Sequence, residues 1–111
     1  MPSNSLAEFE LLVMLAALRL GPDEAYTVSI ADDIRERTGR FVRRANVYTT
    51  LQRLEAKGLV SGALGEPRPE RGGRPPRLIT VLPDGLAALR TTTDAIQAMM
   101  GGLGSALRDT P

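Results

Sequence analysis

The most informative stretch of this chain is NVYTTLQRLEAKGLV, residues 46–60. Its apolar side chains recur at steps of four and three, which places them on one side of an α-helix that can pack into a core. These residues are Val47, Leu51 and Leu54. A neighbouring stripe is polar and cationic, and it consists of Asn46, Thr50, Arg53 and Lys57, with Thr49 beside it. The stretch therefore predicts a helix with two different faces, which stops at a glycine and leads into a short strand.

The polar stripe and the sequence after it indicate a nucleic-acid-binding fold. Hydrogen-bonding and cationic side chains with almost no acid among them suit base edges and phosphates in a DNA major groove. After the helix come a short strand, a basic loop at residues 66–77 and a second apolar run at residues 78–82. This order is typical of a winged helix-turn-helix. We therefore predict a mostly α fold with a small two-stranded β wing.

The bulk composition argues against several classes of protein. The 111 residues suffice for one domain with a modest core, and 42% of them are hydrophobic. The absence of cysteine and histidine removes disulfides, thiolate metal sites and the commonest general base. The longest apolar run, residues 11–18, is far shorter than the roughly 20 residues of a membrane span. We expect a cytoplasmic protein that is not an enzyme, holds no metal or cofactor and does not enter a membrane.

The charges are segregated along the chain, although the formal net charge is only +1. Residues 1–39 carry a net charge of −4, residues 40–77 carry +6 and residues 78–111 carry −1. The basic middle segment coincides with the polar helix and the loop, which favours a nucleic-acid partner. A solvated basic face without a partner is the alternative.

Two further helices are expected before the polar helix. The first should run over residues 5–20, with Ser5 as its N-cap, and it is apolar on nearly all sides. In so small a domain, part of its cover is expected from a second subunit. The second helix should begin after Thr27 or Ser29 and end near Gly39. Its inward-facing residues should be Ile30, Ala31 and Ile34.

Arginines mark both ends of the predicted DNA-binding segment. Arg43 and Arg44 stand where a small polar N-cap residue would be expected, so they suit phosphates better than the helix end. In the loop an arginine recurs every three residues around the tight turn at Gly72-Gly73, at Arg68, Arg71, Arg74 and Arg77. Such a hairpin loop can reach into a minor groove or along a backbone. A disordered, solvated loop is the alternative.

A final helix is expected over residues 83–107, opened by Pro83. Its apolar seam has the steps of three and four of a coiled coil, and consists of Leu86, Leu89, Ile96, Met100, Leu103 and Leu107. Its symmetry mate, alongside the first helix, is the favoured partner, and packing back onto its own domain is the alternative. Glycines weaken the last turns, so fraying is expected beyond about residue 100. Residues 5–82 then form the DNA-binding domain, followed by a C-terminal dimerisation helix.

These motifs resemble those of the PadR-like transcriptional regulators. The pattern has Tyr48 in the polar helix, followed by LQRLEAKGLV at residues 51–60 and GGRPPR at residues 72–77. A Pro-Asp-Gly helix start follows at residues 83–85, and the resemblance covers roughly residues 6–92. Helix, wing and terminal helix match in order and spacing, so the motifs are fairly specific.

The resemblance implies a homodimeric winged-helix repressor that binds an inverted repeat in double-stranded DNA. The recognition helix would span about residues 44–57 and the wing about residues 59–82. The chain departs from the family pattern at Arg43, at Ala45, where a glycine is usual, and at Leu78-Ile79, where two aromatics are usual. Some members bind flat aromatic drugs between tryptophans at the dimer interface, and this chain has no tryptophan.

The sequence pattern and the resemblance together predict three sets of functional residues. The DNA-binding set is Arg43, Arg44, Asn46, Tyr48, Thr49, Thr50, Arg53, Lys57, Arg71, Arg74 and Arg77. The dimer-interface set is Leu11, Leu15, Leu18, Leu89, Ile96, Met100 and Leu103. A cavity for a small hydrophobic effector would be lined by Met14, Leu18, Met99 and Met100. Such methionines are more often core or interface filler. The alternative function is a winged helix that docks an acidic protein partner.

Overall fold

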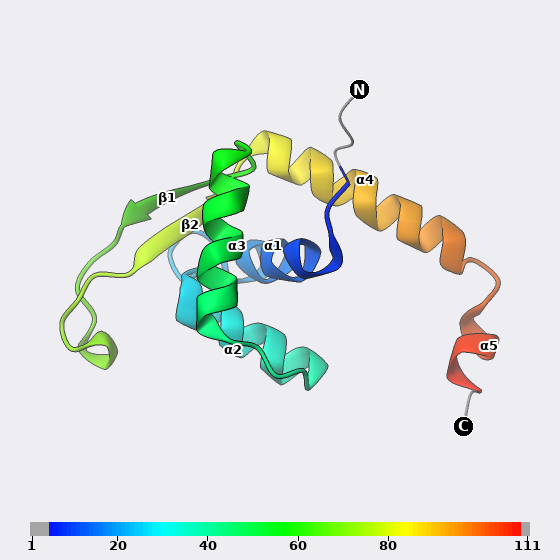
Figure 1. The fold of residues 1–111 in the computed structure, drawn as a ribbon, viewed down its shortest axis with the longest axis horizontal. Helices are drawn as coiled ribbons and strands as arrows, with labels where there is room; N and C mark the ends of the chain where they lie inside the picture. The colour runs from blue at the N-terminus through cyan, green and yellow to red at the C-terminus, as the bar shows by residue number, and fades with distance from the viewer. Residues whose placement is uncertain (1–4, 110–111) are drawn as a thin grey trace.

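Three helices, a two-stranded sheet and a long C-terminal helix follow one another in the computed structural model, which describes residues 5–109 (Figure 1). The elements are α1 (Glu8–Leu20), α2 (Thr27–Thr38), α3 (Arg44–Ala56), β1 (Val60–Leu64), the 3-10 helix η1 (Pro69–Arg71), β2 (Arg77–Val81), α4 (Pro83–Met100) and α5 (Gly104–Arg108). The predicted mostly α fold with a two-stranded wing is confirmed.

α1 lies at the centre of the fold, and its own chain covers most of its apolar surface. Val13 and Met14 are fully buried, and Leu11 is 8% exposed. α2, α3, β2 and α4 all pack against this helix. Leu11, predicted at the dimer interface, therefore packs into the core of its own chain. Leu18, near the end of α1, remains 48% exposed.

Both of the first two helices begin at positions that differ from the predicted ones. α1 begins at Glu8, later than predicted, because Glu10 and not Ser5 caps its first turn. Oε1 of Glu10 accepts a hydrogen bond from the backbone N–H of Ala7 at 3.0 Å. α2 begins at Thr27 itself. Its predicted inward residues Ile30, Ala31 and Ile34 are all buried.

The wing is an antiparallel hairpin that leaves α3 through a glycine. Gly58 has a φ of +76°, in the left-handed region, where it ends the helix and turns the chain into β1. At the base of the hairpin Val60 pairs with Val81. The N–H of Ile79 in β2 donates to the carbonyl of Ala25 at 2.8 Å, so a backbone hydrogen bond ties the wing to the segment before α2. The wing is thus joined to the helical core by backbone hydrogen bonds.

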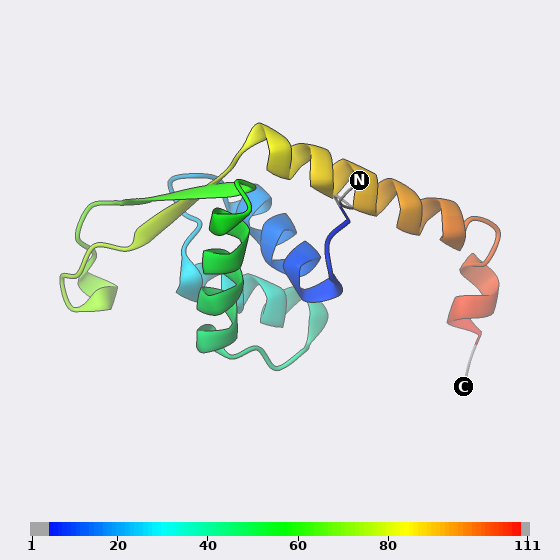
Figure 2. The same ribbon diagram turned by 45° about the horizontal axis from the view of Figure 1, so that its top comes forward.

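α4 touches the core only through its first half and then projects away from it (Figure 1, Figure 2). Gly85 permits the close crossing, because a Cβ there would lie 2.1 Å from the carbonyl oxygen of Leu59. At the middle of the helix, Oγ1 of Thr92 accepts a hydrogen bond from the N–H of Leu6 at 2.9 Å. Residues 94–100 are all exposed. The outer half of α4 therefore has no cover from the described part of its own chain.

The predicted continuous helix over residues 83–107 is wrong, because α4 ends at Met100. Gly102 adopts a φ of +81°, and the separate helix α5 starts at Gly104. The glycines thus make a turn between two helices where fraying was predicted. Within residues 5–109, no helix combines the length and the apolar character needed to cross a membrane.

A partly buried ion pair ties the C-terminal end of α3 to α1. Glu10 is 6% exposed, and its Oε2 accepts a hydrogen bond from Nζ of Lys57 at 2.9 Å. Burial by itself raises the pKa of Glu10. The hydrogen bonds from Lys57 and from the N–H of Ala7, with the charges of Lys57 and Arg53, outweigh burial and leave this pKa below its usual value. Glu10 is therefore ionised in the folded protein at neutral pH.

We expect this ion pair to make part of the stability acid-sensitive. Because the pKa of Glu10 is lower in the folded chain than in the unfolded chain, its stabilisation is fully present above the usual value of 4.5. That stabilisation is lost as the pH falls through the folded pKa. Glu10→Gln should therefore lower the melting temperature at neutral pH and flatten its decline on acidification. Thermal melts followed by circular dichroism between about pH 7 and about pH 3 measure both effects.

Glu8→Gln is the matched control, because Glu8 lies two residues away and its side chain is 73% exposed. Its acid dependence should stay close to that of the wild type. Equal losses of melting temperature on acidification in the wild type and in Glu10→Gln would contradict the assignment of acid sensitivity to the pair of Glu10 and Lys57.

Candidate nucleic-acid interface

α3 presents a polar and cationic face to solvent because its apolar stripe is buried. Val47 and Leu54 are 0% exposed and Leu51 is 4% exposed, so the opposite side of the helix faces outward. A shallow groove of about 280 Å³ runs along this outer side. It is lined by Phe9, Asn46, Thr49, Thr50 and Arg53. The groove places hydrogen-bonding groups and one guanidinium side by side on the helix.

Not all of the predicted stripe is equally accessible. Thr50 is only 5% exposed. Lys57 is engaged with Glu10, although its side chain is 49% exposed. Tyr48 is 52% exposed, and its hydroxyl oxygen accepts a hydrogen bond from Nε2 of Gln52 at 3.1 Å. The accessible part of the stripe is therefore narrower than predicted, and consists of Asn46, Thr49 and Arg53, whereas Tyr48 is exposed on another side of the helix.

Two arginines lie at the N-terminal end of α3. Arg43 is the N-cap residue, and its side chain makes no capping hydrogen bond. Its guanidinium carbon lies 5.7 Å from the ring centre of Phe41, which is 79% exposed. Arg44, the first residue of the helix, is exposed. Both cations therefore stand at the positive end of the helix dipole, where an anion such as a phosphate is favoured.

The wing arginines, which recur regularly in the sequence, have different surroundings in the structure. Arg77 donates a hydrogen bond to Oε2 of Glu55 on α3 at 2.7 Å. Arg74 is exposed, and its Nε donates to the carbonyl of Arg71 at 3.2 Å. Arg71 is half-buried, and its guanidinium carbon lies 5.4 Å from the ring centre of Tyr26. Arg74 and Arg77 are thus the more accessible cations of the predicted wing set.

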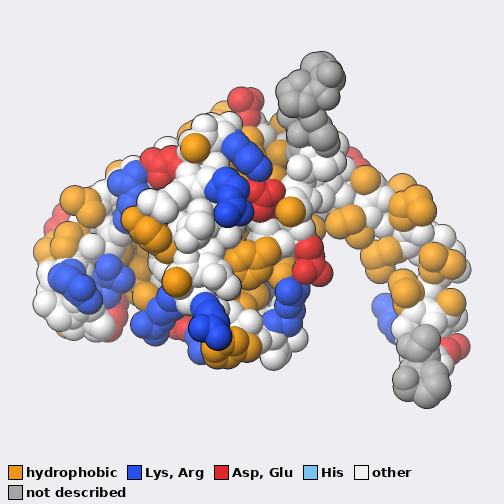
Figure 3. All heavy atoms as spheres, in the orientation of Figure 1, with side chains coloured by type: hydrophobic (Ala, Val, Ile, Leu, Met, Phe, Trp, Pro, Cys, Tyr) orange, Lys and Arg blue, Asp and Glu red, His pale blue; other side chains and the backbone are white. Residues whose placement is uncertain are grey.

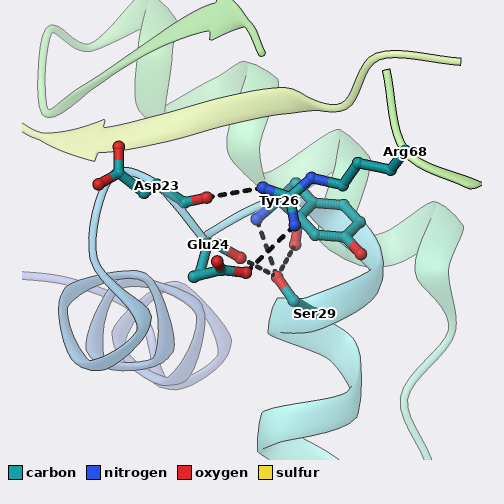
Figure 4. A network of polar contacts seen from close by, with 5 residues as sticks. All are labelled: Asp23, Glu24, Tyr26, Ser29 and Arg68. Atoms are coloured by element: carbon teal, nitrogen blue, oxygen red, sulfur yellow. Dashed lines mark hydrogen bonds and ion pairs between the residues drawn. The ribbon is translucent and has the colours of Figure 1, made fainter. Parts of the chain in front are cut away.

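Arg68 clamps the wing to the segment between α1 and α2 (Figure 4). Its guanidinium donates to Oε2 of Glu24 at 3.1 Å and to the carbonyl of Asp23 at 2.7 Å, and lies 5.4 Å from the ring centre of Tyr26. Ser29 supports the segment, because its Oγ donates to the carbonyl of Glu24 at 2.6 Å and accepts from the N–H of Tyr26 at 3.0 Å. The contacts of Arg68 with this segment were not predicted from the sequence.

The basic side chains gather over α3, over the turn before it and over the wing (Figure 3). These are the elements of the segment that carries the net charge of +6, residues 40–77. The same view shows a run of hydrophobic side chains along the outer part of α4 and along α5. The cationic and the apolar surfaces therefore occupy different parts of the molecule.

The predicted dimer-interface residues differ in exposure. Leu89 is 4% exposed and, like Leu11, packs into the core of its own chain, whereas Leu15 is half-buried. The remaining members are between 42% and 49% exposed, and are Leu18, Ile96, Met100 and Leu103. These four residues are the ones most open to another molecule.

The predicted effector cavity is not formed within one chain. Met14 is fully buried, and its Cε lies 2.9 Å from the position that a Cβ of Gly85 would take. Met99 is 78% exposed on the outer half of the same helix as Gly85. At about 1.5 Å per residue, the two places on α4 are roughly 20 Å apart along its axis. Within one chain, the four nominated side chains therefore do not surround one space.

The clamp around Arg68 generates a prediction about the wing. Arg68→Ala should speed amide hydrogen exchange in the loop, at the N–H of residue 68 and the N–H of Gly73, which are bonded across it. Arg74→Ala removes the same charge from the same loop without touching the Asp23–Tyr26 segment, and should leave these rates near those of the wild type. Equal rates in the Arg68 and Arg74 variants would mean that the clamp does not hold the wing.

Comparisons with known proteins bear on the fold. No protein-family model matches the chain, and a search of the curated proteins finds no match. A solved PadR family transcriptional regulator from Eggerthella lenta DSM 2243 is 23% identical, with a TM-score of 0.67 over 93% of this chain and 88% of that chain. A PadR family transcription regulator from Clostridium difficile R20291 is 19% identical, with a TM-score of 0.70 over 91% of this chain and 99% of that chain.

A PadR-like transcriptional regulator from Bacillus cereus strain ATCC 14579 is 16% identical, with a TM-score of 0.69 over 90% of this chain and 94% of that chain. At such identities the likeness concerns the fold. It extends over about nine-tenths or more of this chain and between 88% and 99% of the other chains. The chain therefore has the winged-helix fold of the solved PadR-family regulators.

Proposed function

We propose that this protein is a sequence-specific, DNA-binding transcriptional regulator that acts as a homodimeric repressor on an inverted-repeat operator. One observation carries the proposal: α3 buries its apolar side completely and exposes a polar and cationic side next to a basic wing. The known proteins with this fold support it, since those compared above are transcriptional regulators.

Base reading is assigned to the accessible stripe of α3. An amide such as that of Asn46 can form two hydrogen bonds with adenine, and a guanidinium such as that of Arg53 can do so with guanine. Both side chains line the shallow groove of α3, so they would enter the major groove together. Arg43, Arg44, Arg74 and Arg77 would contact phosphates, which supplies affinity but no direct sequence information.

Dimerisation is assigned to the outer half of α4. Its apolar side chains are exposed, Ile96 by 42%, Met99 by 78% and Met100 by 49%, so they lack a partner among the described residues. Pairing of this half with its symmetry mate would bury them and give a two-fold assembly. Two recognition helices about 34 Å apart, one DNA turn, would then meet the two halves of an inverted repeat.

The base-reading assignment predicts the effect of Arg53→Ala. Fluorescence anisotropy on DNA from upstream of the protein's own gene, against scrambled DNA, should give a specific complex at least about a thousandfold tighter. Arg53→Ala should weaken the specific complex by roughly tenfold to a hundredfold, because a bidentate base contact is lost. Arg90→Ala, an exposed arginine on α4, removes the same charge as a control and should change little.

Measuring both DNA affinities at several salt concentrations distinguishes sequence-specific binding from binding by a generic basic surface. A steep decline of affinity with salt and no discrimination between the two DNAs would leave a generic basic surface, and docking of an acidic protein would then replace the repressor proposal. Unchanged operator affinity in Arg53→Ala would mean that another face of α3 reads the bases.

The dimer assignment predicts the effect of Met99→Asp. A charge at the centre of the exposed apolar patch should convert the dimer to a monomer in sedimentation velocity and weaken the operator complex. Leu64→Asp is the matched control for the sedimentation measurement alone, because Leu64 is 72% exposed but lies on the wing strand β1. A wild-type protein that sediments as a monomer at micromolar concentration would contradict the dimeric arrangement, and would leave the assignment of α3 intact.

A further inference from the structure

The turn between α2 and α3 presents an aromatic ring to solvent. Phe41 is 79% exposed, which makes it the most exposed of the large hydrophobic side chains within residues 5–109. A single exposed hydrophobic residue is common on protein surfaces and by itself indicates no site. This ring, however, belongs to the stretch RFVRR, residues 40–44, directly before and at the start of α3, so its surroundings are cationic.

The backbone on both sides of Phe41 is held in place. On one side, Val42 is buried in the core at 7% exposure. On the other side, the N–H of Arg40 donates to Oγ1 of Thr38 at 3.1 Å, and the guanidinium of Arg40 pairs with Glu8 of α1 at 2.9 Å. The ring is therefore carried by a turn that is anchored to the core and to α1, which lowers the entropy that its binding would cost.

The ring adjoins the N-terminal end of α3. The guanidinium carbon of Arg43, the N-cap residue of α3, lies 5.7 Å from the centre of the Phe41 ring. The N–H of Asn46, at the next turn, donates to the carbonyl of Arg43 at 3.0 Å, and Asn46 lines the groove of α3. Hydrophobic and cationic side chains lie side by side at this end of α3 (Figure 3). The ring, the N-cap arginine and the groove thus follow one another along the face assigned to DNA.

The charge around the ring favours a polyanion as its partner. Arg43 and Arg44 are both exposed, and residues 37–54 contain no aspartate or glutamate. Cations at the start of a helix suit a phosphate, because the helix dipole adds to their charge. An acidic protein would also match this charge, but the ring continues the groove whose amide and guanidinium suit base edges.

Duplex DNA offers one apolar group to such a ring in the major groove. The C5 methyl group of thymine projects into this groove, and apolar side chains, phenylalanine among them, contact it there. The N-terminal end of a recognition helix is the part that reaches the base edges. Cytosine and uracil lack this methyl group, so a ring that contacts it distinguishes thymine from both.

We propose that Phe41 is a base-reading residue that contacts the C5 methyl group of a thymine in each half of the operator. Arg43 binds the neighbouring phosphate and holds the ring at the edge of the base. This inference rests on the proposed function, because it requires a specific DNA complex. It adds an apolar contact from outside α3 to the hydrogen bonds assigned to Asn46 and Arg53.

Replacing thymidine by deoxyuridine tests the contact, because it removes only the methyl groups and keeps the base pairs. Anisotropy titrations would combine the wild type and Phe41→Ala with the upstream DNA in its thymidine form and in its fully deoxyuridine-substituted form. In such a double-mutant cycle, effects that do not involve Phe41 cancel. Phe41→Ala should weaken the thymidine complex by about tenfold, for one apolar contact in each half-site, and the deoxyuridine complex by no more than about twofold.

Arg43→Ala is the matched control, since it removes the neighbouring phosphate contact and keeps the ring. It should weaken the thymidine and deoxyuridine complexes by the same factor and make the salt dependence of both shallower. Phe41→Leu keeps an apolar side chain, so its affinity for the thymidine DNA should lie between those of the wild type and Phe41→Ala. Circular dichroism verifies that the three variants are folded.

The cycle distinguishes a base contact from a purely structural role of the ring. Equal weakening of both complexes by Phe41→Ala would overturn the contact, because the ring would then serve only to position Arg43. Unchanged affinity of Phe41→Ala for the thymidine DNA would also overturn it and would leave the ring to an acidic protein. Both results leave the proposed function standing if the wild type still discriminates upstream from scrambled DNA. A wild type without this discrimination would overturn the proposed function and the contact together.

Discussion

α3 buries only one of its sides, and the rest of the structure depends on which side that is. Val47 and Leu54 are inaccessible to solvent and Leu51 is nearly so, because α1, α2 and β1 close over them. A shift of one position in this packing would turn the polar stripe into the core, where its unpaired polar groups would be costly. The hydrophobic core thus fixes the direction in which the candidate DNA-reading side chains face.

The hydrophobic core alone does not fix the position of the wing relative to α3. Two polar contacts help to hold these elements in place. Lys57 joins the end of α3 to Glu10 on α1, so its ammonium group is already paired within the folded chain. Arg68 joins the wing to the segment before α2. Because both contacts are made by cations of the basic segment, the net charge of that segment overstates the number of cations free for nucleic acid.

The sequence predicted the elements whose signals are local. The spacing of Val47, Leu51 and Leu54, the glycine at position 58 and the two apolar runs around the basic loop were enough for the winged helix. The sequence did not predict which arginine faces which partner, since Arg68 and Glu24 lie 44 residues apart and no periodicity links them. The break after Met100 was also missed, because the heptad spacing continues through glycines that turn the backbone.

Tyr26 explains why part of the placement of the wing escaped prediction. The guanidinium carbons of Arg68 and Arg71 both lie 5.4 Å from the centre of its ring, so one buried aromatic side chain supports two arginines of the loop. Arg77 of β2 pairs with Glu55 of α3 at 2.7 Å. The position of the wing therefore depends on contacts with two different helical segments, made by residues that are far apart in the sequence.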